Sequence, residues 1–275
     1  MELINEGGDL SPNARLGRRV RRLRLDKGLS LRQLSERITG YSHSYIARVE
    51  VGKQGASDAL VKALDEFFGT GGTLAEIKDM ARETVIAQYS REYVRREGEA
   101  TLIQAFTSSV IPGLLQTREY ARELFRTRSF GNSEEELAAQ VATRMLRQDV
   151  FLRDDPPYYS AVIDEAALRR PTVDIGIMRD QVAHLLESAA NPQVTVQVLP
   201  FDQGVYPMLG GSLDLLTLKS GRTVALVESF RSGDVVHSSA SLLELVQYFD
   251  VTRSKALPAS DSLDLMRNYL KEYER

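Results

Sequence analysis

The sequence contains no cysteine, and this absence excludes several kinds of chemistry. Disulfides, thiolate metal sites and a cysteine nucleophile are ruled out, and a chain without cysteine suits a reducing compartment. Long apolar runs are also missing. The segment Val194–Leu199 is interrupted by Thr195 and Gln197, whereas a membrane helix needs about 20 apolar residues. The acidic start, Met1–Glu6, lacks the basic and apolar regions of a secretory signal. We therefore expect a cytoplasmic protein with no membrane contact.

Residues that commonly carry catalysis or metals are sparse as well. The three histidines (His43, His184 and His237) share no metal-ligand spacing, and the chain has no HExxH, GxGxxG or GxSxG motif. Asp164 and Glu165 follow a predicted strand, where active-site acids often occur. The segment Asp164–Arg170 fits a capped helical turn equally well, with acids near its start and bases near its end, and we favour that interpretation. We expect no enzyme, no catalytic residue, no metal and no cofactor.

The small net charge of −3 conceals an uneven distribution of charge. Residues 12–68 contain 12 Lys and Arg against 6 Asp and Glu, while the rest of the chain has 23 basic and 32 acidic residues. A basic module on an acidic body is typical of a protein that binds nucleic acid through one part only. The alternative is an arginine-rich helix face that is simply solvated.

Four short helices are predicted within residues 12–72, after a flexible leader of residues 1–11. Ser11, the Ser30–Gln33 capping box, Ser42 and Ser57 mark their starts. The expected helices are about Pro12–Lys27, Leu31–Ile38, one beginning after Ser42 and one beginning after Ser57. The turn Thr39–Tyr41 contains Gly40, which can adopt a positive φ. Two short helices joined by such a turn are typical of a helix-turn-helix, whose second helix lies in the major groove of DNA.

Gly69, Gly71 and Gly72 mark the end of this domain. Residues 73–98 are expected to form a connecting helix, and residues 99–275 a C-terminal α+β sensor or partner-binding domain. We predict its helices at about 117–128, 134–153, 175–190, 239–251 and 260–274, and its strands at 158–163, 194–199, 212–218 and 223–230. The predicted fold class is α+β: an all-α helix-turn-helix domain of four to five helices, followed by a mixed domain of helices and an antiparallel sheet. Ser220–Arg222 is expected to link the last two strands as a hairpin.

The residue identities in the N-terminal segment support this interpretation further. Leu29–Ser35 together with Ser42–Gly52 resembles the Cro/cI-type, or xenobiotic-response-element, family of regulators. The resemblance implies a structural ion pair between Arg24 and Glu50. It also implies that DNA contacts come from the recognition helix and its flanks, with these predicted residues: Arg32, Ser42, His43, Ser44, Tyr45, Arg48 and Lys53.

The individual roles follow from the chemistry of each side chain. His43 and Ser44, at the start of the recognition helix, are expected at base edges, although His43 also fits a plain surface position. Arg48 is expected at a guanine edge or a phosphate, and Arg32 and Lys53 at phosphates. Tyr45 fits either a DNA contact or packing of its ring against Tyr41.

The C-terminal region carries a second resemblance. Its segments Val110–Ala121, Ile163–Arg170, Asn191–Phe201 and Gly211–Leu213 are similar to the domain of unknown function that follows this helix-turn-helix in regulators of filamentous actinobacteria. Genes of that family often lie beside a gene for a small acidic protein, and the pair is described as antitoxin-like. The resemblance therefore implies that a small acidic protein is a candidate partner.

We therefore expect a sequence-specific regulator that binds double-stranded DNA as a homodimer, with a C-terminal domain that binds a partner protein or an effector. The alternative is an antitoxin-like component that neutralises a small partner protein and regulates its own operon. A third hypothesis, a ligand-metabolising enzyme with a DNA-binding appendage, predicts turnover that survives deletion of residues 1–72.

Overall fold

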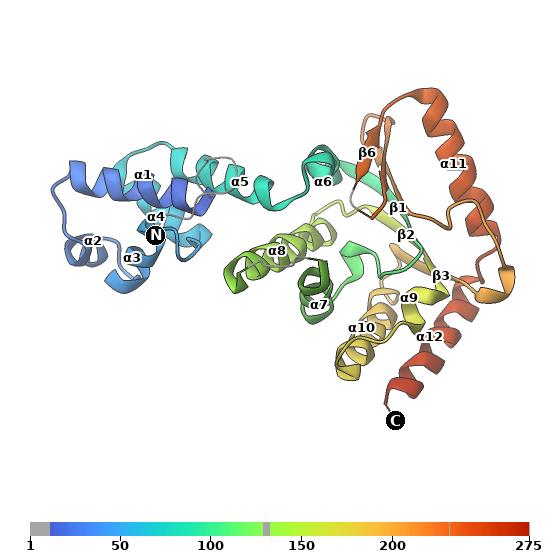
Figure 1. Ribbon diagram of the computed structural model, residues 1–275. Coiled ribbons are helices and arrows are strands. Elements are labelled where there is room, and N and C mark those ends of the chain that lie inside the picture. The colour runs from blue at the N-terminus through green and yellow to red at the C-terminus, as the bar shows by residue number, and fades with distance from the viewer. Residues whose placement is uncertain (1–11, 129–132, 231, 275) are drawn as a thin grey trace. The chain divides into compact units, whose positions relative to one another are not determined.

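The computed structural model describes residues 12–128, 133–230 and 232–274 (Figure 1). The expected leader, residues 1–11 with the predicted cap Ser11, lies outside the described residues. The chain divides into two compact units. One comprises the residues up to 86 together with 132–140, and the other comprises the remainder. Each unit is described separately below.

The first unit is built from helices around one apolar core. Its helices are α1 (Pro12–Asp26), α2 (Leu31–Arg37), α3 (His43–Glu50), α4 (Asp58–Phe68) and α5 (Thr73–Val85). The first four match the predicted helices closely because the residues that start and end each helix lie within or next to it in the sequence. Ser30 forms the capping box with Gln33, and Ser42 and Ser57 each accept a hydrogen bond from the third backbone N–H of their helix. Their apolar stripes meet in a core that includes Leu16, Val20, Leu34, Ile46, Val49 and Leu64.

The expected connecting helix over residues 73–98 is interrupted. The helix α5 ends at Val85, a 3₁₀ turn, η1 (Gln88–Ser90), follows, and α6 (Arg91–Glu97) begins a new helix. Helix α5 packs against α1 and α4, so it belongs to the helical unit. Asp65 of α4 fixes its start by accepting hydrogen bonds from the backbone N–H groups of Leu74 and Ala75, both at 3.0 Å. The prediction of one continuous helix was therefore wrong.

The second unit contains a six-stranded mixed sheet. Its strands are β1 (Ala100–Thr107), β2 (Tyr158–Asp164), β3 (Val194–Leu199), β4 (Ser212–Leu218), β5 (Thr223–Glu228) and β6 (Gly233–Val236), in the order β3-β2-β1-β4-β5-β6. The pairs β1–β4, β4–β5 and β5–β6 are antiparallel, as expected, whereas β1–β2 and β2–β3 are parallel. Parallel neighbours require crossover connections, and helices supply them here. The α+β class is confirmed, and the expectation of a purely antiparallel sheet is corrected.

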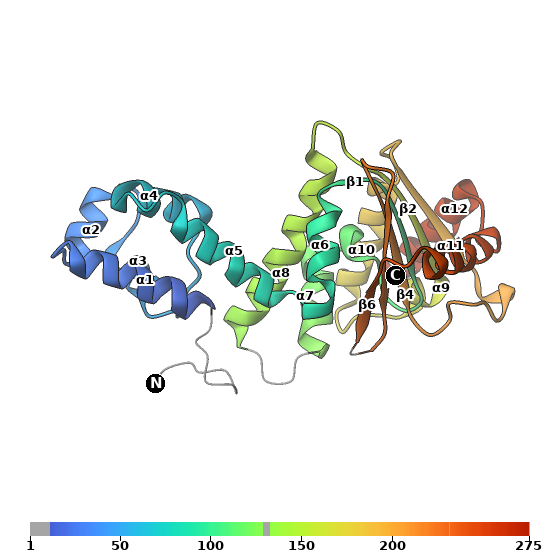
Figure 2. The ribbon, with the colours of Figure 1, turned by 90° about the horizontal axis from the view of Figure 1, so that it is seen from above.

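Helices and 3₁₀ turns complete the second unit. They are α7 (Arg118–Arg128), the part of α8 (Glu134–Arg147) from residue 141 onward, α9 (Glu165–Arg169), α10 (Ile175–Ser188), α11 (Ser239–Ser254), α12 (Ala259–Tyr273), η2 (Gly113–Leu115), η3 (Gln148–Leu152) and η4 (Phe201–Gln203). One sheet face packs on α6, α7 and α10, and the other packs on α11 (Figure 2). Helix α12 lies along β3, where Ser262 accepts a hydrogen bond from the N–H of Val198 at 3.0 Å. This contact protects a sheet edge.

Two strands were missed by the sequence analysis. The central strand β1 is covered on both faces, so its apolar residues do not alternate, and the edge strand β6 has only four residues. The predicted hairpin at Ser220–Arg222 is confirmed: β4 and β5 are antiparallel neighbours, and Gly221 has a φ of +79°.

Candidate nucleic-acid interface

The unit α2–turn–α3 has the geometry of a helix-turn-helix. Gly40 in the turn has a φ of +97°, and the Ser35 hydroxyl donates to the carbonyl of Tyr41 at 2.6 Å. Ser42 then starts α3 by accepting the N–H of Tyr45 at 3.2 Å. Leu34 and Ile46 are fully buried between the helices. The sequence of the turn therefore fixes the angle at which α3 leaves α2 (Figure 1).

Close contact with α1 holds the end of α3 in place. A Cβ atom on Gly17 would lie 2.2 Å from the carbonyl oxygen of Val49 and 2.7 Å from that of Glu50. Gly52, just after α3, has a φ of +73° and lies against Ala14. The sequence analysis missed Gly17. Its signal was a glycine inside a helix, where it costs about 1 kcal/mol relative to alanine and so points to a packing requirement.

The structure brings Arg24 and Glu50 together in a buried ion pair. Arg24 Nε donates to Glu50 Oε1 and Nη2 donates to Oε2, both at 2.6 Å. The two side chains are 9% and 3% exposed. Arg24 Nη1 also donates to the carbonyl of Leu29 at 2.7 Å, and the hydrogen bond to Glu50 raises the pKa of Arg24. This bidentate contact joins α1 to the last residue of α3.

Polar side chains cover the free surface of α3 and its flanks. His43, Ser44 and Arg48 are exposed, as are Arg32 at the start of α2 and Lys53 after α3. Ser44 and Arg48 are four residues apart and therefore share one helix face. His43 Nε2 lies 3.4 Å from Ser44 Oγ. These side chains can offer hydrogen bonds to base edges and positive charge to phosphates.

Two predicted DNA contacts already have partners within the domain. The Tyr45 hydroxyl donates to the carbonyl of Gly55 at 3.2 Å and accepts the N–H of Ser57 at 2.9 Å, and its ring centroid lies 6.3 Å from that of Tyr41. Arg48 Nε donates to Gln54 Oε1 at 2.7 Å. Tyr45 therefore holds the loop after α3, and Gln54, which the sequence analysis missed, orients Arg48.

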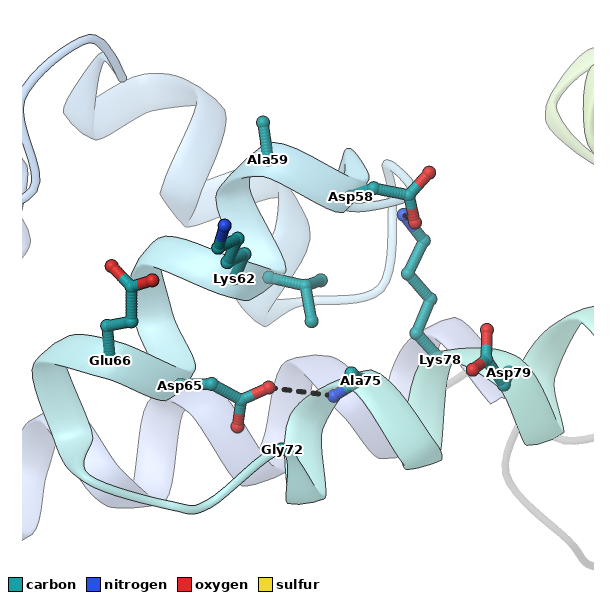
Figure 3. A pocket seen from close by; sticks show the side chains of 10 residues that line it. Asp58, Ala59, Lys62, Asp65, Glu66, Gly72, Ala75, Lys78 and Asp79 are labelled. Carbon is teal, nitrogen blue, oxygen red and sulfur yellow. Dashed lines mark hydrogen bonds and ion pairs between the residues drawn. The ribbon is translucent and has the colours of Figure 1, made fainter.

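A second surface feature of this unit is a depression between α4 and α5 (Figure 3). Its lining includes the carboxylates of Asp58, Asp65, Glu66 and Asp79 beside Lys62 and Lys78. Asp65 is engaged at the start of α5, as the hydrogen bond to Ala75 in Figure 3 shows. This concentration of acids is unsuited to phosphate, so the depression is a poor candidate for the DNA-binding surface.

The acids considered as catalytic candidates have structural contacts. Asp164 accepts the N–H of Ala166 at 2.7 Å, as the capped turn predicts, and the hydroxyl of Tyr206 at 2.5 Å. Glu165 accepts the hydroxyl of Tyr269 at 2.5 Å and the N–H of Phe201 at 2.8 Å. Within residues 12–128, 133–230 and 232–274, no cluster of three metal-ligating side chains occurs. No helix in those same ranges has the length and apolar character to cross a membrane.

Comparison with known proteins agrees with this division of the chain. Residues 15–76 match the family model of a helix-turn-helix domain, and residues 90–268 match that of a domain of unknown function, DUF5753. No curated protein and no solved structure matches the chain. The second match covers more than half of the chain and the first covers the unit that carries α2 and α3, so the chain belongs to the DUF5753 family and has a helix-turn-helix domain of the kind found in DNA-binding regulators.

Proposed function

We propose that the protein is a sequence-specific transcription regulator that reads the major groove of DNA with α3 and acts as a homodimer. The observation that carries this proposal is the construction of α3. Its buried end is fixed by Glu50 and the close contact at Gly17, while its polar start is exposed. A rigid helix with free polar residues at its N-terminal end suits recognition of base edges. Two copies would read two half-sites one helical turn apart.

The test is a binding-site map over the whole genome, followed by affinity measurements on the operator that it defines. Arg48→Ala is expected to weaken binding by about 1–3 kcal/mol and to relax preference at one base step, if Arg48 contacts a base. Lys53→Ala is expected to weaken binding to all sequences and to reduce the salt slope by about 1, as loss of one phosphate contact does. Arg267→Ala is the control, because Arg267 is an exposed arginine on α12. Operator affinity unchanged in both test variants contradicts the placement of α3 in DNA.

The C-terminal domain is proposed to bind a partner protein or an effector. Large apolar side chains are exposed on it, among them Val205 at 81% and Leu243 at 62%. Exposed apolar side chains of this size are available for contact with another protein, and their exposure supports the proposal. Binding of chromosomal DNA by the other unit places the protein in the cytoplasm under this proposal.

The antitoxin-like role is the second candidate, and the same exposed apolar residues favour it. In that case the domain neutralises a small acidic protein encoded beside it, while the helix-turn-helix represses the shared operon. Co-expression of the two genes tests this role. Toxicity of the small protein alone, relieved by the present chain, supports the antitoxin function, whereas a harmless neighbour that does not co-purify contradicts it.

A further inference from the structure

One sheet face of the C-terminal domain is apolar except at one end. The residues of this face include Ile103 and Ala105 on β1, Leu216 on β4, and Val224 and Leu226 on β5, all buried in one core. Strand alternation places four polar residues on the same face. These are Thr107, Ser212, Asp214 and Glu228, from the end of β1, the beginning of β4 and the end of β5.

The strand register sets these four residues beside one another. Thr107 pairs with Ser212, and Ser212 pairs with Glu228. Asp214 lies two residues further along β4, opposite Ala105. Neighbouring strands are about 4.8 Å apart, so the longer side chains of this group reach one another. We call these four residues the polar corner.

Helix α8 contributes two cationic side chains next to the polar corner. Arg147 donates to both carboxylate oxygens of Glu97 on α6, at 2.8 and 2.9 Å, so these two charges satisfy each other. Arg144 donates to Gln116 Oε1 at 2.9 Å, and its guanidinium lies 4.7 Å from the ring centroid of Phe125. Burial and the nearby charge of Arg147 lower the pKa of Arg144 to about 10.

The charges in this region do not balance. With Arg147 and Glu97 paired, Arg144 remains near the two carboxylates of Asp214 and Glu228. Arg128, at the end of α7, is exposed and therefore screened by solvent. The polar corner thus carries an excess of one negative charge when Asp214 is ionised. Burial and the charge of Glu228 raise the pKa of Asp214 to about 8.

Two groups of the polar corner lack hydrogen-bond partners. Thr107 is 7% exposed, and its hydroxyl oxygen makes no hydrogen bond within the part of the chain that the structure describes. Asp214 is partly buried, and its carboxylate accepts no hydrogen bond from the described residues. Buried polar groups are nearly always hydrogen-bonded, so the unpaired hydroxyl of Thr107 points to a missing donor. Asp214, which is only partly buried, is free to accept a hydrogen bond from the same donor.

An organic ammonium group matches these acceptors. It carries one positive charge and three N–H donors, and Asp214, Glu228 and Thr107 present two carboxylates and one hydroxyl. One aromatic ring borders the corner: Tyr89 lies over Gly233, the residue that pairs with Glu228, and its hydroxyl is hydrogen-bonded to Glu228. Aromatic faces attract cations, and a carboxylate gives the ammonium group its counter-charge.

We propose that the polar corner binds a small organic ammonium compound, with Asp214 as its principal counter-ion and Thr107 as an additional acceptor. Asp214 is only partly buried, which leaves the corner accessible to a small molecule. The role of the polar corner as the effector site of a regulator rests on the proposed function. Binding of the ammonium compound itself does not depend on that function.

The probe is n-butylammonium chloride, titrated into the full-length protein and followed by calorimetry and thermal unfolding. We expect saturable binding and a rise in unfolding temperature, with no such effect from n-butanol or from sodium chloride at equal ionic strength. Asp214→Asn is expected to weaken binding by at least about tenfold, because the counter-charge is removed and a charge-assisted hydrogen bond to a carboxylate becomes one to a neutral amide oxygen. Glu228→Gln and Thr107→Val are expected to weaken it less.

Asp234→Asn is the matched control, since Asp234 is an exposed acid on β6 of the same sheet. Absence of binding to the wild-type protein overturns the proposal, as does binding that Asp214→Asn leaves unchanged while the variant remains folded. DNA binding is measured on the same samples. A protein that binds its operator and ignores n-butylammonium refutes this inference alone, and the reverse result refutes the proposed function alone.

Discussion

Removal of the Glu50 carboxylate is expected to destabilise the helix-turn-helix domain sharply. The variant Glu50→Ala leaves the guanidinium of Arg24 buried, with the carbonyl of Leu29 as its remaining hydrogen-bond acceptor among the described residues. Both charged side chains are more than nine-tenths buried and are joined by two hydrogen bonds of 2.6 Å. Breaking a buried pair in this way costs about 3–5 kcal/mol. A domain of this size has about 5–15 kcal/mol to lose, so the helical unit approaches its stability limit.

The measurements are urea and thermal unfolding of the full-length chain, with hydrogen exchange of residues 12–68 assigning the loss to this unit. A destabilisation of 1 kcal/mol lowers the melting temperature of a small domain by about 4–8 °C, so Glu50→Ala is expected to lower it by more than about 12 °C. Arg24→Met combined with Glu50→Leu is expected to recover part of the loss, because apolar residues of similar volume replace a buried pair at little cost.

Asp58→Ala is the matched control, since it removes a carboxylate that is 69% exposed and bonded to Lys78 in the same unit. Its expected effect is below about 1 kcal/mol. The reasoning is refuted if Glu50→Ala costs no more than this control. It is also refuted if the loss of stability in the double variant equals the sum of the losses measured for Arg24→Met alone and Glu50→Leu alone. Either result would mean that the pair contributes like a surface contact despite its burial.

Three further changes test other parts of the structure. Gly17→Ala is expected to destabilise the helical unit by about 1–3 kcal/mol, as overpacking does. Urea unfolding measures the loss, and a curve identical to that of the wild-type protein would show that α3 shifts freely to make room for the methyl group. Tyr45→Phe removes a hydroxyl that bridges Gly55 and Ser57. A loss of about 0.5–1.5 kcal/mol is expected, with exchange rising in the loop after α3; unchanged exchange there would contradict the bridging role. For Asp214, the raised pKa means that the folded state holds its proton longer, so stability falls as pH rises from about 4 to about 8. Asp214→Asn should flatten this fall in unfolding curves across that range, and an unaltered pH profile would exclude Asp214 as its source.

The sequence analysis located the helix-turn-helix well because its signals are local. Each cap is read within three residues of the helix start, and Gly40 identifies the turn by its own conformational freedom. The closeness of Arg24 and Glu50 was inferred from family resemblance. Their spacing of 26 residues carries no periodic signal that would reveal it. The close contact at Gly17 depends on two backbones meeting, which a single sequence marks only by an unexpected glycine.

The second unit was harder to predict because its sheet depends on non-local pairing. Strand direction is decided by the crossovers between β1, β2 and β3, and composition does not show it. Asp214 illustrates the difficulty. In the segment Ser212–Leu218 it stands between two leucines, as a solvent-facing residue would in a half-buried strand. Both faces of β4 carry core residues, and Asp214 is therefore partly buried at the end of a face whose other residues join the apolar core.

The two units differ in whether their inward-facing charged groups are paired within the protein, and this difference bears on their roles. In the helical unit, Arg24 and Glu50 satisfy each other, so α3, the proposed recognition helix, is held against α1 without a ligand. In the C-terminal unit, Asp214 lacks a donor, and its ionisation is suppressed by burial and by Glu228. A charge that is already paired gains little from a further ligand, whereas a partly buried carboxylate without a protein partner gains a charged hydrogen bond. Ligand binding is therefore expected to alter the energetics of the C-terminal unit, while the DNA-binding surface stays preformed.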